Sequence, residues 1–441
     1  MKLFWKFLYS YAVIPLLWCL FQGAGFLNEK VRRGIRGRSG LFPRLEVEST
    51  KLHSGTRVWF HSSSMGEFEQ AKPIIAELKK RYPQSRILVT FFSPSGYEHS
   101  RKYPLADLVS YLPFDSIGNA RRFIATLRPD VAILVRYDIW PNHIWELHRA
   151  KIPVLIANAT MGRRTLRRLP IVRAFHHTVY DDIDAILTVS ESDAEMFRSF
   201  ELTHPDIQPI GDTRFDQVRA RSQDALKRHL IPHRILDGKK VLVAGSCWAE
   251  DDAELIPAFL ELQETVRNLL LIHVSHELTP DHLKELKREL NGKTSFIRFS
   301  ALNEYSGERV IIVDSVGILL TLYASAHVAF IGGSFRQGIH NVLEAAVFGI
   351  PVVFGPDHHN SQEPLMLVER GGGFVARDTH ELKRTLGHLL EDENARASAG
   401  RSAMEFVHFH TGATDRFITC LESHVKFQEP SDMKLPAEVS S

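Results

Sequence analysis

This chain of 441 residues has few cysteines, little net charge and no repetition. Its three cysteines, Cys19, Cys247 and Cys420, are far apart and show no metal-ligand spacing, which predicts reduced thiols in a cytosolic body without a disulfide framework. The formal net charge is only +2, which argues against a general nucleic-acid binder. We find neither an internal repeat nor a low-complexity tract.

Two further absences concern metals and processing. No Asp-x-Asp follows a predicted strand; the motif at 182–184 precedes one, where it is expected to cap a turn. Among 22 histidines, His273 and His276 are three residues apart at a strand end, but they lack a third ligand at familiar spacing. We therefore interpret them as ordinary polar residues and expect no metal site. No small-residue cleavage site precedes the basic run at 30–38, which argues against a removed signal peptide.

The one long apolar run lies at the N-terminus, where residues 7–27 carry no charged side chain. A helix needs about 20 apolar residues to span a bilayer, so the run is marginally long enough, although Pro15, Gly23 and Gly25 weaken it. We expect residues 1–38 to form a membrane anchor with a basic flank, as a single-pass or an interfacial helix; a buried core helix is the alternative. The flank, which places its side in the cytoplasm, consists of Lys30, Arg32, Arg33, Arg36 and Arg38.

Beyond the anchor, short apolar strands alternate with amphipathic helical stretches in two series. This alternation predicts parallel sheets with right-handed crossovers. We expect an α/β protein with two doubly wound, Rossmann-like domains facing a cleft, at 39–216 and 217–428, and a disordered tail at 429–441. The last helix before the tail is free to pack back on the first domain. The predicted strands are 57–60, 87–90, 131–135, 154–157, 185–189, 241–244, 269–274, 310–313, 328–331 and 351–354.

The segment 328–356 holds a candidate ligand site in the second domain. A buried strand leads into Gly332 and Gly333, and a helical stretch with Asn341 and Glu344 at its mouth follows. A strand, a glycine turn and a helix start place free backbone N–H groups and the positive dipole end at one spot, where α/β proteins hold phosphate. Asn341 and Glu344 also have the N-x-x-E spacing of a capping pair, so a purely structural role is equally compatible.

Glu67 is the chemical candidate of the first domain. It follows the first strand, where helical apolar spacing begins. The dipole and free N–H groups of a helix N-terminus favour its ionised form, in which it could accept a proton from an incoming hydroxyl as a general base. The alternative is a capping box, because Ser64 and Glu67 have the S-x-x-E spacing.

Two further segments carry polar candidates. Arg136 and Asp138 directly follow a predicted strand and are expected to line the cleft; alternatively, Trp140 packs and Asp138 caps the next helix. In 158–168, arginines recur at i, i+1, i+4 and i+5, which on a helix gives one strongly cationic face. That face is either a solvated surface or a binding site for lipid phosphates. Its members are Arg163, Arg164, Arg167 and Arg168.

Taken in order, these motifs resemble those of the 3-deoxy-D-manno-octulosonic acid (Kdo) transferases of lipopolysaccharide synthesis. SSSMGE at 62–67 is similar to the family's S-V-G-E, and HNVLE at 340–344 to its H-N-x-L-E. VAGSCWAEDDAE at 243–254 resembles G-S-T-W-x-x-E-(D/E)-E, with Cys247 where threonine is usual. The resemblance runs from the anchor to about residue 415. Other similar segments are TFFSPSGYE at 90–98, YLPFD at 111–115, RPD at 128–130, WPN at 140–142, GDTRFD at 211–216, GGS at 332–334 and FGP at 354–356.

The resemblance implies an inverting glycosyltransferase of the two-domain GT-B fold. It would move Kdo from CMP-Kdo to a lipid A precursor (lipid IVA) at the cytoplasmic face of the inner membrane, without a metal or other cofactor and without a nucleic-acid partner. Glu67 matches the catalytic base. The expected donor-binding residues are His276, Asp314, Gly317, Gly332, Gly333, Ser334, Asn341 and Glu344. On the acceptor side we expect Ser64, Gly66, Arg136, Asp138, Arg163 and Arg164.

Two segments depart from the family's pattern. Arg136-Tyr137-Asp138 stands where many members have Glu-Thr-Glu, so only the second acid is kept. Arg136 is therefore expected to change how a phosphate or an acidic sugar of the acceptor is held. The loop VDSVGILL at 313–320 has Ile318 where the family's G-D-x-x-G-E-L has glutamate.

Two other functions are compatible with the sequence. One is another GT-B transferase that uses a UDP-sugar on a lipid acceptor. The other is a catalytically idle, membrane-bound binding protein of the same fold. Competition by CMP or by UDP distinguishes a UDP-sugar transferase from a Kdo transferase. An activity assay distinguishes the idle binding protein from both enzymes.

Overall fold

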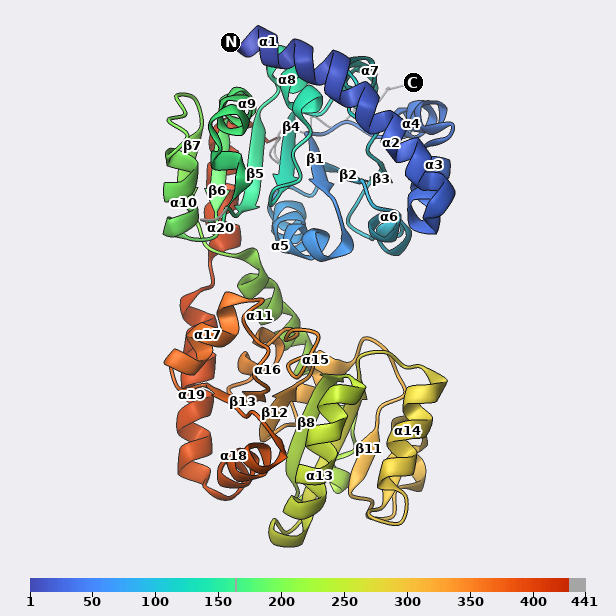
Figure 1. The fold of residues 1–441 in the computed structure, drawn as a ribbon, viewed down its shortest axis with the longest axis vertical. Helices are drawn as coiled ribbons and strands as arrows, with labels where there is room; N and C mark the ends of the chain where they lie inside the picture. Colours follow the sequence, from blue (N-terminus) through green and yellow to red (C-terminus); the bar gives the residue numbers. More distant parts are fainter. Residues whose placement is uncertain (163–164, 428–441) are drawn as a thin grey trace, which may run out of the picture. The chain divides into compact units, whose positions relative to one another are not determined.

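The computed structural model of the chain describes residues 1–162 and 165–427. The chain divides into two compact units (Figure 1): unit 1 comprises Met1–Gln217 and the chain from Thr411 onward, and unit 2 comprises Val218–His410. The end of the chain therefore returns to the unit that contains its beginning. Each unit has a parallel seven-stranded sheet with helices, so the predicted class of two doubly wound α/β domains is confirmed.

The sheet of unit 1 has the strand order β3-β2-β1-β4-β5-β6-β7, and all of its pairs are parallel. The order reverses between β1 and β4, whose carboxyl ends therefore lie side by side at the point where open α/β sheets hold ligands. The strands are β1 (Arg57–Ser62), β2 (Arg86–Phe91), β3 (Leu108–Tyr111), β4 (Val131–Val135), β5 (Val154–Ala159), β6 (Ala185–Thr188) and β7 (Asp206–Pro209).

Successive side chains of these strands point to opposite sides of the sheet. Helices cover both sides, so both faces are buried. On one face, Val58 and Phe60 pack with α5 and the returning helix α20; on the other, Trp59 packs with α7 and α8. The helices are α3 (Glu29–Arg38), α4 (Leu41–Thr50), α5 (Met65–Arg81), α6 (Pro94–Ser100), α7 (Ile117–Leu127), α8 (Pro141–Arg149), η2 (Leu166–Arg168), α9 (Pro170–Tyr180), α10 (Glu191–Arg198), α11 (Thr213–Ala225) and α20 (Ala413–His424).

The N-terminal apolar segment is one continuous helix made of α1 (Lys2–Leu8), a π turn η1 (Tyr9–Val13) and α2 (Ile14–Leu27). Its 26 residues are long and apolar enough to cross a membrane. Pro15 does not break it. Proline cannot donate a backbone hydrogen bond and its ring crowds the carbonyl four residues earlier; the wider π turn directly before Pro15 accommodates both. In Figure 1 the helix runs along unit 1, beside α8 and α9.

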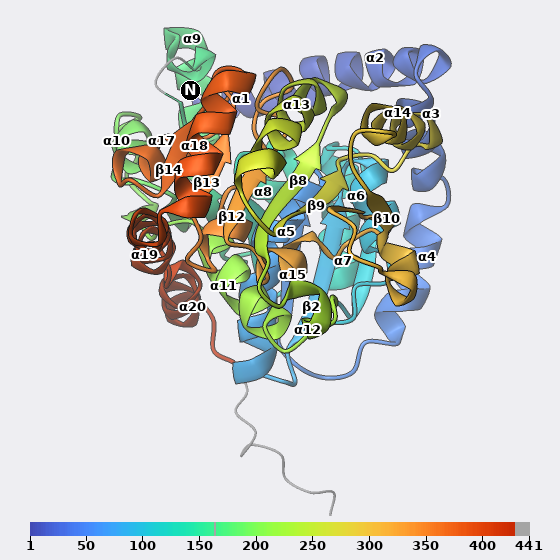
Figure 2. The ribbon, with the colours of Figure 1, turned by 90° about the horizontal axis from the view of Figure 1, so that it is seen from below.

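The sheet of unit 2 has the order β10-β11-β9-β8-β12-β13-β14, again parallel, with its reversal between β8 and β12. Helices α13 and α18 pack together over one face (Figure 2), and α15 contacts β8. The strands are β8 (Lys240–Cys247), β9 (Leu269–Ser275), β10 (Phe296–Arg298), β11 (Val310–Ile312), β12 (Val328–Ile331), β13 (Val352–Phe354) and β14 (Gly373–Val375). The helices are α12 (His233–Leu236), α13 (Ala249–Thr265), α14 (Pro280–Leu290), η3 (Phe299–Glu304), α15 (Leu319–Tyr323), α16 (Leu343–Ala346), α17 (Gln362–Glu369), α18 (Thr379–Glu391) and α19 (Glu393–Phe409).

All ten strands predicted from the sequence are present, with small differences at their ends. The four strands that the sequence did not indicate are β3, β7, β10 and β14, which are the edges of the two sheets. β10 and β14 are only partly buried and β7 is mostly exposed, whereas three of the four residues of β3 are buried. An edge strand needs less apolar surface, so it lacks the apolar run by which a central strand is found.

Candidate functional site

In unit 1 the candidate site lies where β1 ends and α5 begins. Ser64 is the N-cap of α5 in an extended conformation, and its hydroxyl accepts from the backbone N–H of Glu67 (3.4 Å). Oε2 of Glu67 in turn accepts from the N–H groups of Ser63 (2.6 Å) and Ser64 (3.3 Å). The capping box that competed with a catalytic role is thus formed. It fixes the Glu67 carboxylate at the carboxyl end of β1 without using its other oxygen in a described hydrogen bond.

The protonation of Glu67 differs from the sequence expectation. A helix N-terminus was expected to keep this carboxylate readily ionised. Instead, burial raises the pKa of Glu67 above its ordinary range, and the charge of Asp138 raises it further, against the hydrogen bonds from Ser63 and Ser64. Only 7% of the residue is exposed. The loss of hydration raises the pKa of Glu67 more than the two backbone hydrogen bonds lower it. Glu67 is therefore a stronger base once it is deprotonated.

Asp138, three residues after the end of β4, is connected to the same site by its contact with His61. Its Oδ2 lies 2.8 Å from Nε2 of His61, which is fully buried on β1. Burial alone would raise the pKa of Asp138, but the hydrogen bond and charge of His61 outweigh it, so the pKa of this carboxyl lies below its usual range. Two carboxylates of one site therefore have pKa values shifted in opposite directions, so Glu67 binds a proton more readily than Asp138 does.

Trp140 also belongs to this network. Its Nε1 lies 3.1 Å from Nε2 of His61, and its ring is 4.5 Å from that of Phe92. Phe92 in turn contacts Phe21 of the N-terminal helix, with ring centroids 5.7 Å apart. A line of aromatic rings thus connects the apolar helix with the site inside unit 1. From the sequence, Trp140 could either pack against its neighbours or line the site. Its contacts in the structure do both.

The other acceptor-side candidates of unit 1 are placed as follows. Gly66 is exposed, and a Cβ added there would meet nothing within 4 Å, so the backbone beside Glu67 is open to a ligand. Arg136 follows β4 with φ of 63°, a left-handed conformation that is uncommon for a side chain of this size. Its buried Nε has no hydrogen-bond partner among the described residues, and its guanidinium lies 5.6 Å from the Tyr137 ring.

The cationic helix expected over 158–168 is not formed in the described part of that segment. β5 extends to Ala159, and only the short 3-10 turn η2 follows, because Asn158 adopts a φ of 51° and buries its amide against Gln70 and Thr213. Arg167 donates to the Tyr180 hydroxyl (3.0 Å). Arg163 and Arg164, assigned to the acceptor side, lie outside the described residues.

In unit 2 a stack of three rings lies beyond the carboxyl ends of β8 and β9. Trp248 and His276 have centroids 4.5 Å apart, and His276 and His340 4.2 Å apart with an angle of 9° between their planes. Nε1 of Trp248 lies 3.0 Å from Nε2 of His340. Burial lowers the pKa of His340 to about 4, with the charge of His276 as the second cause, and burial also lowers the pKa of His276. These imidazoles are therefore neutral near pH 7 and offer flat faces rather than charge.

Asp251, in the first turn of α13, ties this stack to the glycine turn after β12. Its Oδ2 accepts from the N–H groups of Trp248 (2.8 Å) and Gly333 (2.7 Å). Gly332 is required sterically, since a Cβ there would come within 2.3 Å of the Ser246 carbonyl, and Gly333 has a φ of 79°. The glycines predicted to let a ligand approach thus also let the loops after β8 and β12 approach each other.

The helix expected after these glycines is different from the prediction. Nine residues separate Gly333 from α16, which has only four residues, so no macrodipole of useful size points at the turn. Asn341 accepts from the Leu343 N–H (3.1 Å), but the N-cap of α16 is Val342, one residue later, which makes no side-chain capping bond; Glu344 lies 3.4 Å from Arg221 of α11. Ser334 is fully buried and joins two loops, because its hydroxyl donates to Ile331 and accepts from Gly355.

Asp314 and Gly317 lie beyond β11, on the other side of β9 from β8. The Asp314 carboxylate accepts from the backbone N–H (3.0 Å) and the hydroxyl (2.6 Å) of Ser300. Gly317 has a φ of 80°, and its side is open. No described contact joins these two residues to the ring stack.

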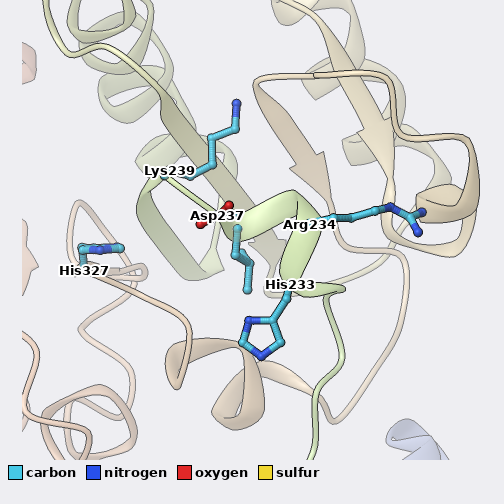
Figure 3. Close-up of a pocket in the computed structure, with 7 residues that line it drawn as sticks. His233, Arg234, Asp237, Lys239 and His327 are labelled. Carbon is cyan, nitrogen blue, oxygen red and sulfur yellow. The ribbon is translucent and has the colours of Figure 1, made fainter.

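A cavity of about 520 Å³ in unit 2 is lined by residues of α12 and by Lys239 and His327. It lies at the amino ends of β8 and β12, opposite to the ring stack, because Lys239 and His327 each precede a strand. In Figure 3, Arg234 and Lys239 point away from one another. The cavity therefore offers no converging set of groups for an anion.

Several residues at these sites were missed by sequence reasoning. His61, Trp248 and His340 stood inside motifs that had been noted, and their position directly after a predicted strand or a glycine turn was the available signal. Cys247, Asp252 and His273 bring their possible ligand atoms within 4.8 Å of one another, although their sequence spacing had suggested no metal site. Asp182, expected to cap a turn, pairs with Lys2 and Lys6 of the N-terminal helix.

Comparison with known proteins agrees with this geometry. The family model of 3-deoxy-D-manno-octulosonic-acid transferase (kdotransferase) matches residues 33–217. A 3-deoxy-D-manno-octulosonic acid transferase of Haemophilus influenzae is 28% identical over 96% of this chain and 99% of its own length. One of Aquifex aeolicus is 30% identical over 79% of this chain and 89% of its own length.

Solved structures share the fold at low identity. UDP-GlcNAc 2-epimerase from Neisseria meningitidis bound to UDP-GlcNAc has a TM-score of 0.59 and 16% identity, covering 83% of this chain and 100% of that one. MurG of Acinetobacter baumannii has a TM-score of 0.50 and 14% identity, covering 83% of this chain and 99% of that one. These neighbours and the two parallel sheets establish a GT-B fold, and the relatives over nearly the whole length establish the rest: the chain belongs to the 3-deoxy-D-manno-octulosonic acid (Kdo) transferase family of glycosyltransferases.

Proposed function

We propose that this glycosyltransferase moves Kdo from CMP-Kdo to a lipid A precursor (lipid IVA), with inversion and with Glu67 as the general base. The observation that carries the proposal is the Glu67 carboxylate itself. It is nearly buried, its pKa is raised, and its backbone contacts fix it at the point where the strand order of unit 1 reverses.

The chemistry follows from that carboxylate. Glu67 takes the proton of an acceptor hydroxyl as that oxygen attacks the anomeric carbon of Kdo. The bond from the anomeric carbon to the phosphate oxygen breaks, and CMP leaves with the bonding electrons. Asp138 stays ionised beside His61 and stabilises the site when Glu67 is neutral. Arg136, with its unpaired Nε, binds an anionic group of the acceptor. None of these steps requires a metal.

Unit 2 holds the donor in this proposal. The faces of His276, His340 and Trp248 suit the cytosine ring of CMP-Kdo, because aromatic and imidazole planes stack on nucleobases. Gly332 and Gly333 serve this site by letting the loops after β8 and β12 approach each other closely.

We further propose that the N-terminal helix lies in the membrane interface on the cytoplasmic side rather than across the bilayer. Lys2 and Lys6 pair with the buried Asp182, Tyr9 donates to Asp115 (2.9 Å) and Ser10 to Asn142 (2.6 Å). These bonds hold the first turns against unit 1, whereas the opposite face exposes apolar side chains. Such a one-sided helix matches interfacial anchors. Of the basic flank, Arg38 is not available to lipid, since it is buried and donates to the Leu112 and Phe92 carbonyls.

The function is tested with detergent-solubilised full-length protein, CMP-Kdo and a tetra-acylated lipid A precursor, and mass spectrometry follows the product. We expect the acceptor mass to rise by Kdo units, and excess CMP to inhibit the reaction more strongly than UDP. Stronger inhibition by UDP would assign a UDP-sugar transferase instead. Binding of CMP-Kdo without any product, with this and other lipid acceptors, would support an idle binding protein.

The orientation of the helix is tested with a membrane-impermeant thiol reagent applied to intact spheroplasts. A Leu3→Cys change in a Cys19→Ser background places the only exposed thiol of the described chain at the first turn. We expect labelling only after lysis. Labelling of intact spheroplasts would place this end in the periplasm and show that the helix spans the bilayer.

A further inference from the structure

Four side chains from four elements of unit 2 meet at the carboxyl ends of β8 and β9. Cys247 is the last residue of β8, Asp252 lies in the first turn of α13, His273 is on β9, and His282 is in the first turn of α14. The possible ligand atoms of the first three lie within 4.8 Å of one another, and all three residues are buried. Asp252 joins both imidazoles, with 2.6 Å from Oδ1 to Nε2 of His273 and 2.8 Å from Oδ2 to Nε2 of His282.

The surroundings of this cluster contain polar atoms that are not satisfied. Among the described residues, the buried Oγ of Ser275 and Nδ1 of His273 have no hydrogen-bond partner. Ser275 is two residues after His273 on β9, so both side chains point to the same face of the sheet. Buried polar atoms without a partner beside a thiol, a carboxylate and two imidazoles are one mark of an ion or a water that fills such a cluster.

The types of ligand atom in this cluster indicate which ion would bind. One thiolate, two imidazoles and one carboxylate are the ligands of tetrahedral Zn²⁺, whose ligand atoms lie about 3–4 Å from one another. The possible ligand atoms of Cys247, Asp252 and His273 already lie within 4.8 Å of one another, and Nε2 of His282 lies 2.8 Å from Oδ2 of Asp252, so side-chain movements, that of His282 included, would bring the four to that geometry. One thiolate and one carboxylate also balance the two charges of the ion. On binding, the thiol proton would pass to solvent, and each neutral imidazole would carry its proton on Nδ1 so that Nε2 is free to bind the ion.

We propose that Cys247, Asp252, His273 and His282 form a structural Zn²⁺ site. The site joins β8, β9, α13 and α14 directly behind the ring stack, because Trp248 follows Cys247 and the His276 N–H donates to the Cys247 carbonyl (2.8 Å). Its role is to hold the loops that carry these rings, and it has no part in the transfer step. The proposal does not depend on the proposed donor or acceptor.

The test measures metal in full-length protein purified in detergent, loaded with Zn²⁺ or Co²⁺ and freed of excess metal by gel filtration. We expect about one ion per chain by mass spectrometry of the elements, and with Co²⁺ an intense tetrahedral visible spectrum with a thiolate charge-transfer band. Cys247→Thr, which restores the residue that the family usually has, should lose the ion and the band. The matched control Cys420→Ser, which changes another buried thiol, should keep both.

A second variant guards against misfolding. His282 is partly exposed and lies on α14, so His282→Asn leaves the sheet intact. It should lower Zn²⁺ affinity at least about tenfold, and Zn²⁺ should raise the melting temperature of the wild type more than that of this variant. Equal metal content in the wild type and Cys247→Thr, or no uptake by either, would overturn the proposal and leave a hydrogen-bonded His–Asp–His cluster.

Discussion

Unit 1 and unit 2 each have a seven-stranded parallel sheet, and most candidate residues lie beyond the carboxyl ends of strands near the reversal of strand order: β1 and β4 in unit 1, and β8, β9 and β12 in unit 2. The residues that the two units place at these strand ends differ. Unit 1 places two carboxylates with oppositely shifted pKa values around a buried imidazole. Unit 2 places neutral rings and glycines, and it uses its carboxylate, Asp251, to fix backbone. The same scaffold thus places titratable carboxylates in one unit and flat, neutral rings in the other.

The largest effect should come from removing the proton acceptor of unit 1. Glu67→Gln is expected to lower the rate of Kdo transfer by about 10²–10⁴-fold, the usual contribution of a general base. The affinity for CMP-Kdo, measured by titration calorimetry, should not change, because that ligand is assigned to unit 2. Ser64→Ala is the control. It removes the cap at a cost of about 1 kcal/mol of stability but keeps the base. A Glu67→Gln variant within a few-fold of the wild-type rate would remove Glu67 from the mechanism.

The scaffold of unit 2 is tested at its tightest glycine. In Gly332→Ala the new Cβ would meet the Ser246 carbonyl at 2.3 Å and Cys247 Cα at 2.6 Å, and both are backbone atoms. We expect a loss of about 1–3 kcal/mol of folding free energy, seen as a lower denaturant midpoint. Gly118→Ala in α7 of unit 1 meets nothing within 4 Å and should be neutral or stabilising. Equal stability of the two variants would mean that the loop after β12 moves freely.

The rings of unit 2 should affect binding and leave chemistry alone. His276→Ala removes the ring that packs on both Trp248 and His340, and loss of one stacking partner costs about 1–3 kcal/mol of binding free energy. KM for CMP-Kdo should therefore rise about 5–100-fold while kcat changes little, the reverse of Glu67→Gln. His388→Ala, an exposed histidine of α18, is the matched control. A fall in kcat with unchanged KM would place His276 in the reaction rather than in donor binding.

The smallest effect concerns the stability cost of the base. Since the native pKa of Glu67 is raised, its ionised form destabilises the fold, and the cost grows as pH rises from the ordinary value of 4.5 through the raised value and is constant above it. Glu67→Gln should therefore melt at a higher temperature than the wild type at pH 8, by about 2–4 °C for each kcal/mol. The two melting temperatures should converge below pH 4.5, where the wild-type carboxyl is neutral in both states. A difference independent of pH would assign the effect to packing.

The candidate residues show where sequence reasoning ends. Glu67 and Asp138 were found because each follows a strand, and the sheet order brings those strands together. The direction of the Glu67 pKa was predicted wrongly, because a helix N-terminus is visible in the sequence whereas the burial that outweighs it is not. The helix after Gly333 is present but shorter than expected, since apolar spacing does not reveal that α16 ends after a single turn. Of the four edge strands, β7, β10 and β14 lacked a signal because they bury less.

The sequence by itself determined the two doubly wound domains, the ten central strands, the apolar helix and the positions of the motifs, because each depends on local periodicity and on residue types adjacent in the chain. Only the tertiary structure decided which side chains meet. His61 with Asp138, His276 with His340, and Cys247 with Asp252, His273 and His282 lie 77, 64 and up to 35 residues apart, as their numbers give. Their proximity follows from strand order and register, which set how separate carboxyl ends come together, and from the burial that this packing imposes on their charges.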